Sequence, residues 1–273
     1  MFKGLCTSVI LGFAAATIVA ATPAKAGNIV LTGHDNDYHQ SVDAIAQAAA
    51  SIKFIRNGSL LPLLTFDSGT QLTSLLTSLG IAFTNVNPGI AASVTDALFN
   101  AAVYSGFAVA SEQSCGGCDN TSAGVANIAT HSTAIQSFFN AGGGIYGLTA
   151  GFDPLGYAYV PQTASNPGGS PSSTGHVQTA AGLSLGIPAV NGDATHNFFS
   201  TPGTAGLSSL YQAVETQGVG GQVLTVALAN GTVTCVGAAC GITGGGGTAV
   251  PEPASLAVLG LGLLGLRVAR RRA

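Results

Sequence analysis

The alternation of strand-like and helix-like segments between residues 28 and 148 is the feature that most constrains the fold. Short strand-like segments occupy residues 28–31, 61–66, 81–84, 101–110 and 145–148, and the uncharged, mostly apolar segment 101–110 is typical of a fully buried strand. Between them, apolar residues recur at helical spacing in residues 41–55, 69–79 and 123–139. Because strands that alternate with helices form parallel sheets, the sequence predicts an α/β fold with a mostly parallel sheet and helices on both faces.

The composition changes after this alternating part. Pro, Gly, Ser, Asn and Thr dominate residues 157–185, which predicts a long irregular excursion. Three late strands are expected at residues 210–215, 223–229 and 232–236. Asn230-Gly231, between the last two of these strands, is a strong signal for a hairpin turn.

The N-terminal residues have the pattern of a secretory signal peptide. Lys3 gives a basic start, an apolar run covers residues 9–21, and Ala24 and Ala26 are the small residues of a cleavage site. We therefore expect a signal helix over residues 1–26, which the signal peptidase of the secretion machinery removes after Ala26. A buried N-terminal helix of the fold is the alternative.

The C-terminal residues combine three features in a fixed order, after a glycine-rich linker at residues 244–249. They are the tripeptide Pro251-Glu252-Pro253, an uncharged apolar helix over residues 254–266, and an arginine cluster with Arg270, Arg271 and Arg272. This order closely resembles the PEP-CTERM sorting domain of Gram-negative bacteria, and the resemblance covers residues 250–273.

The resemblance implies a destination outside the cytoplasm. An exosortase-type processing enzyme would recognise the tail and cleave it near Pro251-Glu252-Pro253. The apolar helix is short for a stable transmembrane helix, which suits a temporary inner-membrane anchor whose arginines stay on the cytoplasmic side. The released protein would reach the cell surface or the exopolysaccharide matrix. A permanent tail anchor is the alternative.

The charge of the body excludes one class of partner. Residues 27–249 contain two bases, Lys53 and Arg56, against ten acids, which gives a formal charge of −8. Without a basic patch to neutralise phosphates, nucleic acid is not expected as a partner. A surface rich in Gly, Ala, Ser, Thr and Asn suits a protein that lives among polysaccharides, so polysaccharide is a candidate partner.

The cysteines of the body fit an oxidising compartment. Four remain after signal-peptide removal: Cys115, Cys118, Cys235 and Cys240. Their even number predicts two disulfides, and sequential pairing, Cys115 with Cys118 and Cys235 with Cys240, is preferred among three connectivities. A redox Cys-x-x-Cys and half of a zinc site remain open for Cys115 and Cys118.

Three segments of the body, residues 31–39, 137–148 and 193–198, together resemble one superfamily. They are similar to the class I glutamine amidotransferase-like fold, in particular its trehalose-utilisation-like branch. The resemblance implies a flavodoxin-like sheet within a domain at residues 27–243. That family has a nucleophilic cysteine just after the strand at residues 145–148, where this chain has Thr149. Amidotransferase activity is therefore not expected.

The richest polar cluster, residues 34–39, follows the first predicted strand, at the edge where α/β sheets bind ligands. Its possible ligands for a divalent metal are His34, Asp35, Asp37 and His39. A general base and a helix-capping loop are the alternatives. Glu112 follows another buried strand, and His196 follows the excursion. We therefore expect a rim whose catalytic candidates are His34, Asp37, Glu112 and His196, with His39 beside them.

No recognised catalytic motif is present, so no cofactor is predicted beyond a possible divalent metal. The sequence favours an exported surface protein with a non-catalytic or ligand-binding α/β domain. The alternative is an extracellular metal-dependent hydrolase acting on carbohydrate-related substrates. A purely structural matrix component is not separated from the first hypothesis by the sequence.

Overall fold

The computed structural model describes residues 26–112, 117–149, 156–164, 169, 172–191, 196–204 and 206–233. All of them belong to one compact unit, Ala24–Glu252. Most of the predicted signal peptide, the glycine-rich linker and the predicted sorting tail lie outside the described residues. Within the described part, no helix is long and apolar enough to cross a membrane.

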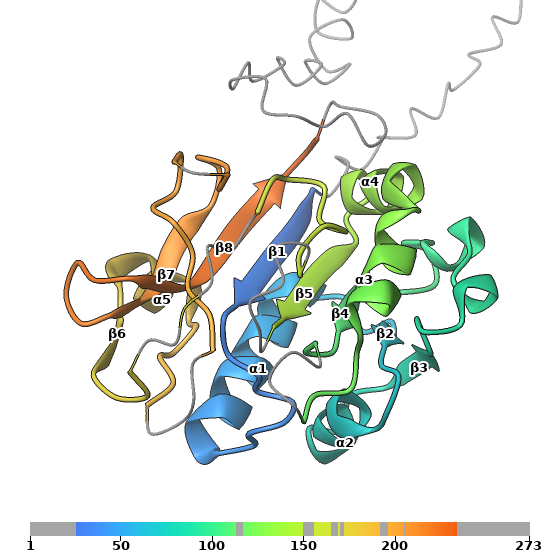
Figure 1. Cartoon of the computed structure of the whole chain (residues 1–273). Helices are drawn as coiled ribbons and strands as arrows, with labels where there is room; N and C mark the ends of the chain where they lie inside the picture. The colour runs from blue at the N-terminus through green and yellow to red at the C-terminus, as the bar shows by residue number, and fades with distance from the viewer. Residues whose placement is uncertain are drawn as a thin grey trace, which may run out of the picture. The chain divides into compact units, whose positions relative to one another are not determined.

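In the described part of the chain, eight strands form one sheet in the order β3-β2-β4-β5-β1-β8-β7-β6 (Figure 1). The strands are β1 (Gly27–Thr32), β2 (Leu63–Phe66), β3 (Phe83–Val86), β4 (Gly106–Val109), β5 (Gly144–Leu148), β6 (His176–Gln178), β7 (Gln212–Gln217) and β8 (Val223–Gly231). The five strands from β3 to β1 pair in parallel, and β8, β7 and β6 add three antiparallel pairings. The predicted α/β class with a mostly parallel sheet is confirmed.

Helices cover both faces of this sheet, as predicted (Figure 1). The helices are α1 (Val42–Arg56), α2 (Gln71–Ser78), α3 (Ser122–Ala129), α4 (Ser132–Asn140) and α5 (Ala180–Leu185), with short 3-10 turns η1 (Ala91–Ser93) and η2 (Asp96–Leu98). Side chains of α1, α2 and α5 pack on one face, and those of α3 and α4 pack on the other.

The structure explains why three consecutive residues in the middle of β1 are apolar. Val30 packs with the α1 side of the core, whereas Ile29 and Leu31 pack with the opposite side. All three are fully buried because successive side chains of a strand point to opposite faces. Each contributes about 1.5–3 kcal/mol through burial, and together they fix the position of the loop that follows.

Helix α1 begins and ends close to the predicted residues, 41–55. The Ser41 hydroxyl accepts a hydrogen bond from the Ala44 N–H, which caps the first turn. The helix stops at Asn57, which adopts a left-handed conformation with φ of 46°. Asp43 in the first turn and the two bases in the last turn complement the helix dipole.

Two predicted elements are shorter than expected. The strand predicted at residues 101–110 is limited to β4, because Asn100 accepts hydrogen bonds from the N–H groups of Ala102, Val103 and Tyr104 and holds them in a turn. The helix predicted at residues 123–139 is two helices, with Thr130 and His131 between them. The Thr130 hydroxyl donates to the Asn127 carbonyl, a local bond that competes with helix continuation.

Two predictions about the late part of the body are wrong. The excursion at residues 157–185 is not irregular throughout, because β6 and α5 lie within it. Asn230-Gly231 is not a hairpin turn, because β8 continues through it and Gly231 pairs with Gly27. Asn230 adopts a φ of 50° in a bulge, and its N–H donates to the Asn28 side chain.

The strand order also corrects the expectation of a flavodoxin-like sheet. In the flavodoxin-like order, 2-1-3-4-5, the first strand pairs with the second. Here β1 lies between β5 and β8, and β2 lies between β3 and β4. The carboxyl end of β1 is therefore next to the antiparallel strands of the sheet, which brings the excursion close to the loop after β1.

Candidate functional site

The loop after β1 is the centre of the candidate site. Gly33 gives it a close contact with the segment that contains His196, because the Gly33 carbonyl accepts from the N–H groups of His196 and Asn197. A Cβ atom on Gly33 would collide with the Asn197 carbonyl. The glycine is needed here for close backbone approach. Two clusters of histidine and carboxylate side chains each include residues of this loop.

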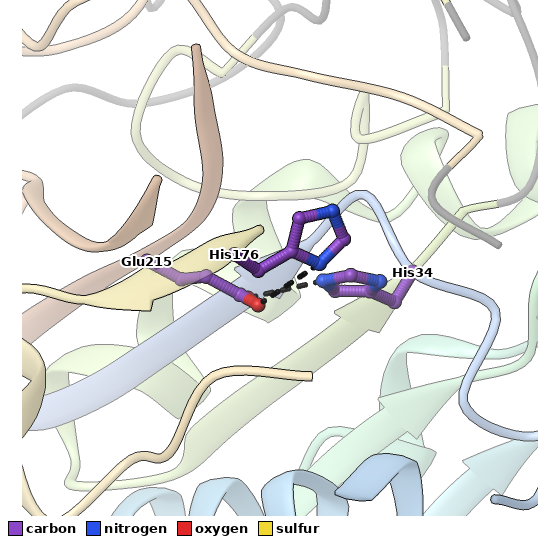
Figure 2. A group of neighbouring side chains, drawn as sticks. All are labelled: His34, His176 and Glu215. Atoms are coloured by element: carbon purple, nitrogen blue, oxygen red, sulfur yellow. Dashed lines mark hydrogen bonds and ion pairs between the residues drawn. The ribbon is translucent and has the colours of Figure 1, made fainter. Parts of the chain in front are cut away.

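The first, which we call the closed cluster, consists of His34, His176 and Glu215 (Figure 2). They come from the β1 loop, β6 and β7, and their possible ligand atoms all lie within 4.8 Å of one another. His34 Nε2 lies 3.0 Å from Glu215 Oε2, and His176 Nδ1 lies 3.7 Å from Glu215 Oε1. The side chains are 0–1% exposed, so the cluster is sealed from solvent.

Glu215 is surrounded by hydrogen-bond donors. Oε2 accepts from the Gln47 side chain at 2.7 Å and the Thr225 hydroxyl at 2.6 Å, and Oε1 accepts from the Val190 N–H at 2.7 Å. Burial opposes ionisation, but the charge of His34 and these hydrogen bonds outweigh it, so the pKa of Glu215 is lowered. The carboxylate is held ionised inside a satisfied network.

His176 connects the excursion at residues 157–185 to the Glu215 carboxylate. Its Nδ1 faces the Val190 carbonyl, and its Nε2 lies 2.7 Å from the Ser172 carbonyl. Its own backbone N–H and C=O bond the Asn191 side chain. The polar contacts of the closed cluster thus fasten three separate chain segments to the end of β1, which is a structural role.

The second, which we call the open cluster, consists of Asp35, His39 and His196. Asp35 Oδ2 lies 3.5 Å from His39 Nε2 and 3.3 Å from His196 Nε2. Asp35 is 1% exposed, whereas His39 and His196 are 38% and 26% exposed. The two imidazole rings are nearly parallel, with centroids 5.8 Å apart. Both rings are therefore reachable from solvent, above a buried carboxylate.

Asp35 also contacts a cysteine. The Sγ atom of Cys118 lies 3.7 Å from Asp35 Oδ2, and Cys118 is buried. The other three cysteines of the predicted disulfides, Cys115, Cys235 and Cys240, lie outside the described residues. Both predicted disulfides remain predictions.

The structure divides the predicted metal ligands among different partners. Asp35 and His39 lie together in the open cluster, while His34 belongs to the closed cluster. Asp37 accepts hydrogen bonds from the backbone N–H and the hydroxyl of Ser111, just after β4. Burial raises the pKa of Asp37 to about 7, although the bonds to Ser111 oppose the shift. Asp37 therefore connects the two strand ends.

Two members of the predicted rim, His39 and His196, lie together, whereas Glu112 contacts the start of α3. His196, which is distant in sequence, joins Asp35 and His39 in the open cluster. Glu112 is buried, and its Oε1 accepts from the Ser122 hydroxyl at the start of α3, which is a helix-start contact. Thr149, at the position of the family nucleophile, is buried, and its hydroxyl has no hydrogen-bond partner among the described residues. Among the described residues, no base is hydrogen-bonded to it.

His176 and Glu215 were not predicted as site residues. His176 lies in the Gly/Ser-rich excursion, where a histidine is expected to be solvated. The one available signal for Glu215 was its position within a strand, between Val214 and Thr216. A carboxylate in a strand is either exposed to solvent or paired with a hydrogen-bonding or charged partner. Nothing in the local sequence identifies its partners, which are His34, Gln47, His176, Val190 and Thr225.

Comparison with known proteins adds information at one end of the chain. Residues 249–273 match the model of the PEP-CTERM protein-sorting motif. This motif implies exosortase-dependent sorting to the cell surface or extracellular space, after transient anchoring at the membrane. No curated protein and no solved structure matches the chain. The amidotransferase-like resemblance of the body therefore gains no support.

Proposed function

We propose that this chain is an exosortase-sorted surface protein whose α/β domain binds a ligand at the carboxyl edge of its sheet. The match of residues 249–273 to the sorting motif is the observation that carries the destination. The strongly acidic, base-poor body suits an extracellular setting rather than nucleic-acid binding. Polysaccharide of the matrix is the partner expected around it.

Binding rather than amidotransferase chemistry is proposed for the body. Thr149 stands where the family places a cysteine, and its hydroxyl has no described base beside it. Two side chains of the open cluster, His39 and His196, are accessible at the carboxyl edge, where open α/β sheets take ligands. The open cluster is therefore the proposed binding face.

Sorting to the cell surface is tested by replacing Pro251, Glu252 and Pro253 with alanine and expressing this variant in the native host. Cell fractionation and the mass of the protein are then compared with those of the unaltered chain. We expect the unaltered protein at the surface or in the medium with a reduced mass, and the variant in the membrane fraction with its tail. Thr248→Ala, just outside the motif, is the matched control. Equal surface delivery of the triple variant would contradict the proposal.

The second candidate is an extracellular metal-dependent hydrolase of carbohydrate-related substrates. It is favoured by the exposure of two imidazoles beside a buried carboxylate, since a catalytic metal site keeps a position open to substrate. A screen for chelator-sensitive release of reducing sugars from purified exopolysaccharide tests it. Activity that is lost in His196→Ala would make this the function, and its absence leaves the binding role.

A further inference from the structure

The open cluster has the geometry of a metal-binding site. Two imidazole nitrogens and one carboxylate oxygen, within 4.8 Å of one another, converge from two distant segments. Ligand atoms about 2.0–2.2 Å from a shared tetrahedral ion lie roughly 3.3–3.6 Å apart. The two distances from Asp35 Oδ2, 3.3 Å to His196 and 3.5 Å to His39, match that spacing.

The backbone holds these donors in place independently of any ion. The Asp35 carbonyl accepts from the N–H groups of Tyr38 and His39, which folds the loop into a turn and puts Asp35 and His39 on the same side. The Tyr38 ring packs edge-on against His39, with centroids 4.7 Å apart. His196 is fixed from the other side by its N–H bond to Gly33. The donor set is therefore preorganised.

The Asp35 carboxylate also has an oxygen without a hydrogen bond and no lysine or arginine nearby among the described residues. Its Oδ1 atom is buried and has no hydrogen-bond partner among the described residues. The two described basic side chains, Lys53 and Arg56, lie in the last turn of α1. The 15-residue helix separates them from this loop by about 20 Å. A buried carboxylate with an unpartnered oxygen is unfavourable, and a cation bound at Oδ2, the oxygen that faces both imidazoles, would offset the cost of its charge.

The closed cluster is a poor competitor for the same ion. Both oxygens of Glu215 already accept hydrogen bonds from Gln47, Thr225 and Val190, and His34 Nε2 is within hydrogen-bond distance at 3.0 Å. An ion would have to displace these donors and enter a sealed region of the core. The open cluster avoids the second step, because His39 and His196 are 38% and 26% exposed.

We propose that Asp35, His39 and His196 bind one divalent transition-metal ion of the zinc class. Imidazole ligands favour Zn²⁺ and its transition-metal neighbours, whereas Mg²⁺ and Ca²⁺ take oxygen ligands. Three protein ligands leave a coordination position toward solvent for water or a ligand donor atom. This inference deepens the proposed function, because it places the ligand of the binding face at a metal centre.

The test is calorimetric titration of Zn²⁺, Mg²⁺ and Ca²⁺ into the full-length protein, purified in a mild detergent and stripped with a chelator. We expect one Zn²⁺ per chain and no saturable binding of the other two ions. His39→Ala and His196→Ala should each weaken Zn²⁺ binding at least about 100-fold, because even outer contacts of metal sites contribute about 10–100-fold. Circular dichroism confirms that each variant is folded.

His131→Ala is the matched control. This histidine lies 2.6 Å from Asp96 on another part of the surface, so its loss should leave Zn²⁺ affinity unchanged. Undiminished binding in both open-cluster variants, or absence of stoichiometric Zn²⁺ in the unaltered protein, would overturn the metal proposal. The sorting experiment does not depend on the metal, so the destination and the metal site can fail separately.

Discussion

The closed and open clusters contain the same kinds of side chain, two histidines and one carboxylate, yet their surroundings differ. In the closed cluster every oxygen of Glu215 has donors, and the side chains are 0–1% exposed. In the open cluster Asp35 Oδ1 is buried without a hydrogen-bond partner among the described residues, and both imidazoles reach solvent. Residue type alone does not separate the two clusters. The two clusters differ in how fully the carboxylate is hydrogen-bonded and in how far the imidazoles are exposed to solvent.

The largest expected effect is on folding stability, from Glu215→Gln in the closed cluster. The amide would turn one NH₂ group toward donors that now share a carboxylate, and it would remove the charge that pairs with His34. We expect the free energy of unfolding to fall by about 3–5 kcal/mol. Urea unfolding at neutral pH measures it. A loss below about 1 kcal/mol would show that the closed cluster does not hold the fold.

The same carboxylate predicts an acid-sensitive stability. The pKa of Glu215 is lowered in the folded protein from its ordinary value of 4.5, so its stabilising contribution is complete above that value and is lost as the pH falls through the lowered pKa. Unfolding curves of the unaltered protein and Glu215→Gln should therefore converge below about pH 4.5. A gap that stays constant as the pH falls would contradict this.

The next largest effect is the stabilisation of the folded protein by Zn²⁺ bound at the open cluster. At Zn²⁺ concentrations 100-fold above the dissociation constant, binding to the folded state should raise the free energy of unfolding by about 2.7 kcal/mol. Thermal melts with and without Zn²⁺ measure this increase. Asp35→Asn should abolish it, and His131→Ala should keep it. Equal stabilisation in Asp35→Asn would place the ion elsewhere.

A smaller effect is expected from Thr225→Val, which removes one of the donors to Glu215 while keeping the shape of the side chain. Thr225 is fully buried, and its hydroxyl also lies 2.8 Å from that of Thr32. The loss of one hydrogen bond to a charged group should cost about 1.5–3 kcal/mol, without any change in Zn²⁺ affinity. A change in Zn²⁺ affinity would show that the two clusters are coupled.

The smallest stability effect is expected from Asp35→Asn in the metal-free protein. The substitution removes a buried charge whose Oδ1 has no described partner, so the free energy of unfolding should change by less than about 1 kcal/mol, in contrast to Glu215→Gln. Paired urea curves measured in chelator give the comparison. A loss as large as that of Glu215→Gln would mean that both clusters are structural.

The local parts of the fold follow closely from the sequence. Ser41 and Asn57 delimit α1 because a side-chain cap and a left-handed residue act over neighbouring residues alone. The apolar run of β1 likewise predicts its burial on both faces. The predicted turn at Asn230-Gly231 is wrong because Gly231 pairs with Gly27, about 200 residues away in the chain, and this pairing outweighs the local turn preference.

The candidate site could be predicted only in part for the same reason. The loop after β1 and its place at the carboxyl edge follow from strand position, and the spacing of Asp35 and His39 places them in one turn. The choice of partners depends on strand order, which puts β8 and β7 beside β1. That order brings Glu215 to His34, and the backbone bond to Gly33 brings His196 to Asp35. Neither contact has a local sequence signal.

The most direct test is the anomalous diffraction of a Zn²⁺-loaded crystal of the protein at the zinc absorption edge. The account predicts one anomalous peak per chain, bonded to Asp35 and the Nε2 atoms of His39 and His196, with Glu215 still bonded to His34. A peak between His34, His176 and Glu215 would contradict it, and so would a crystal with no zinc at the open cluster.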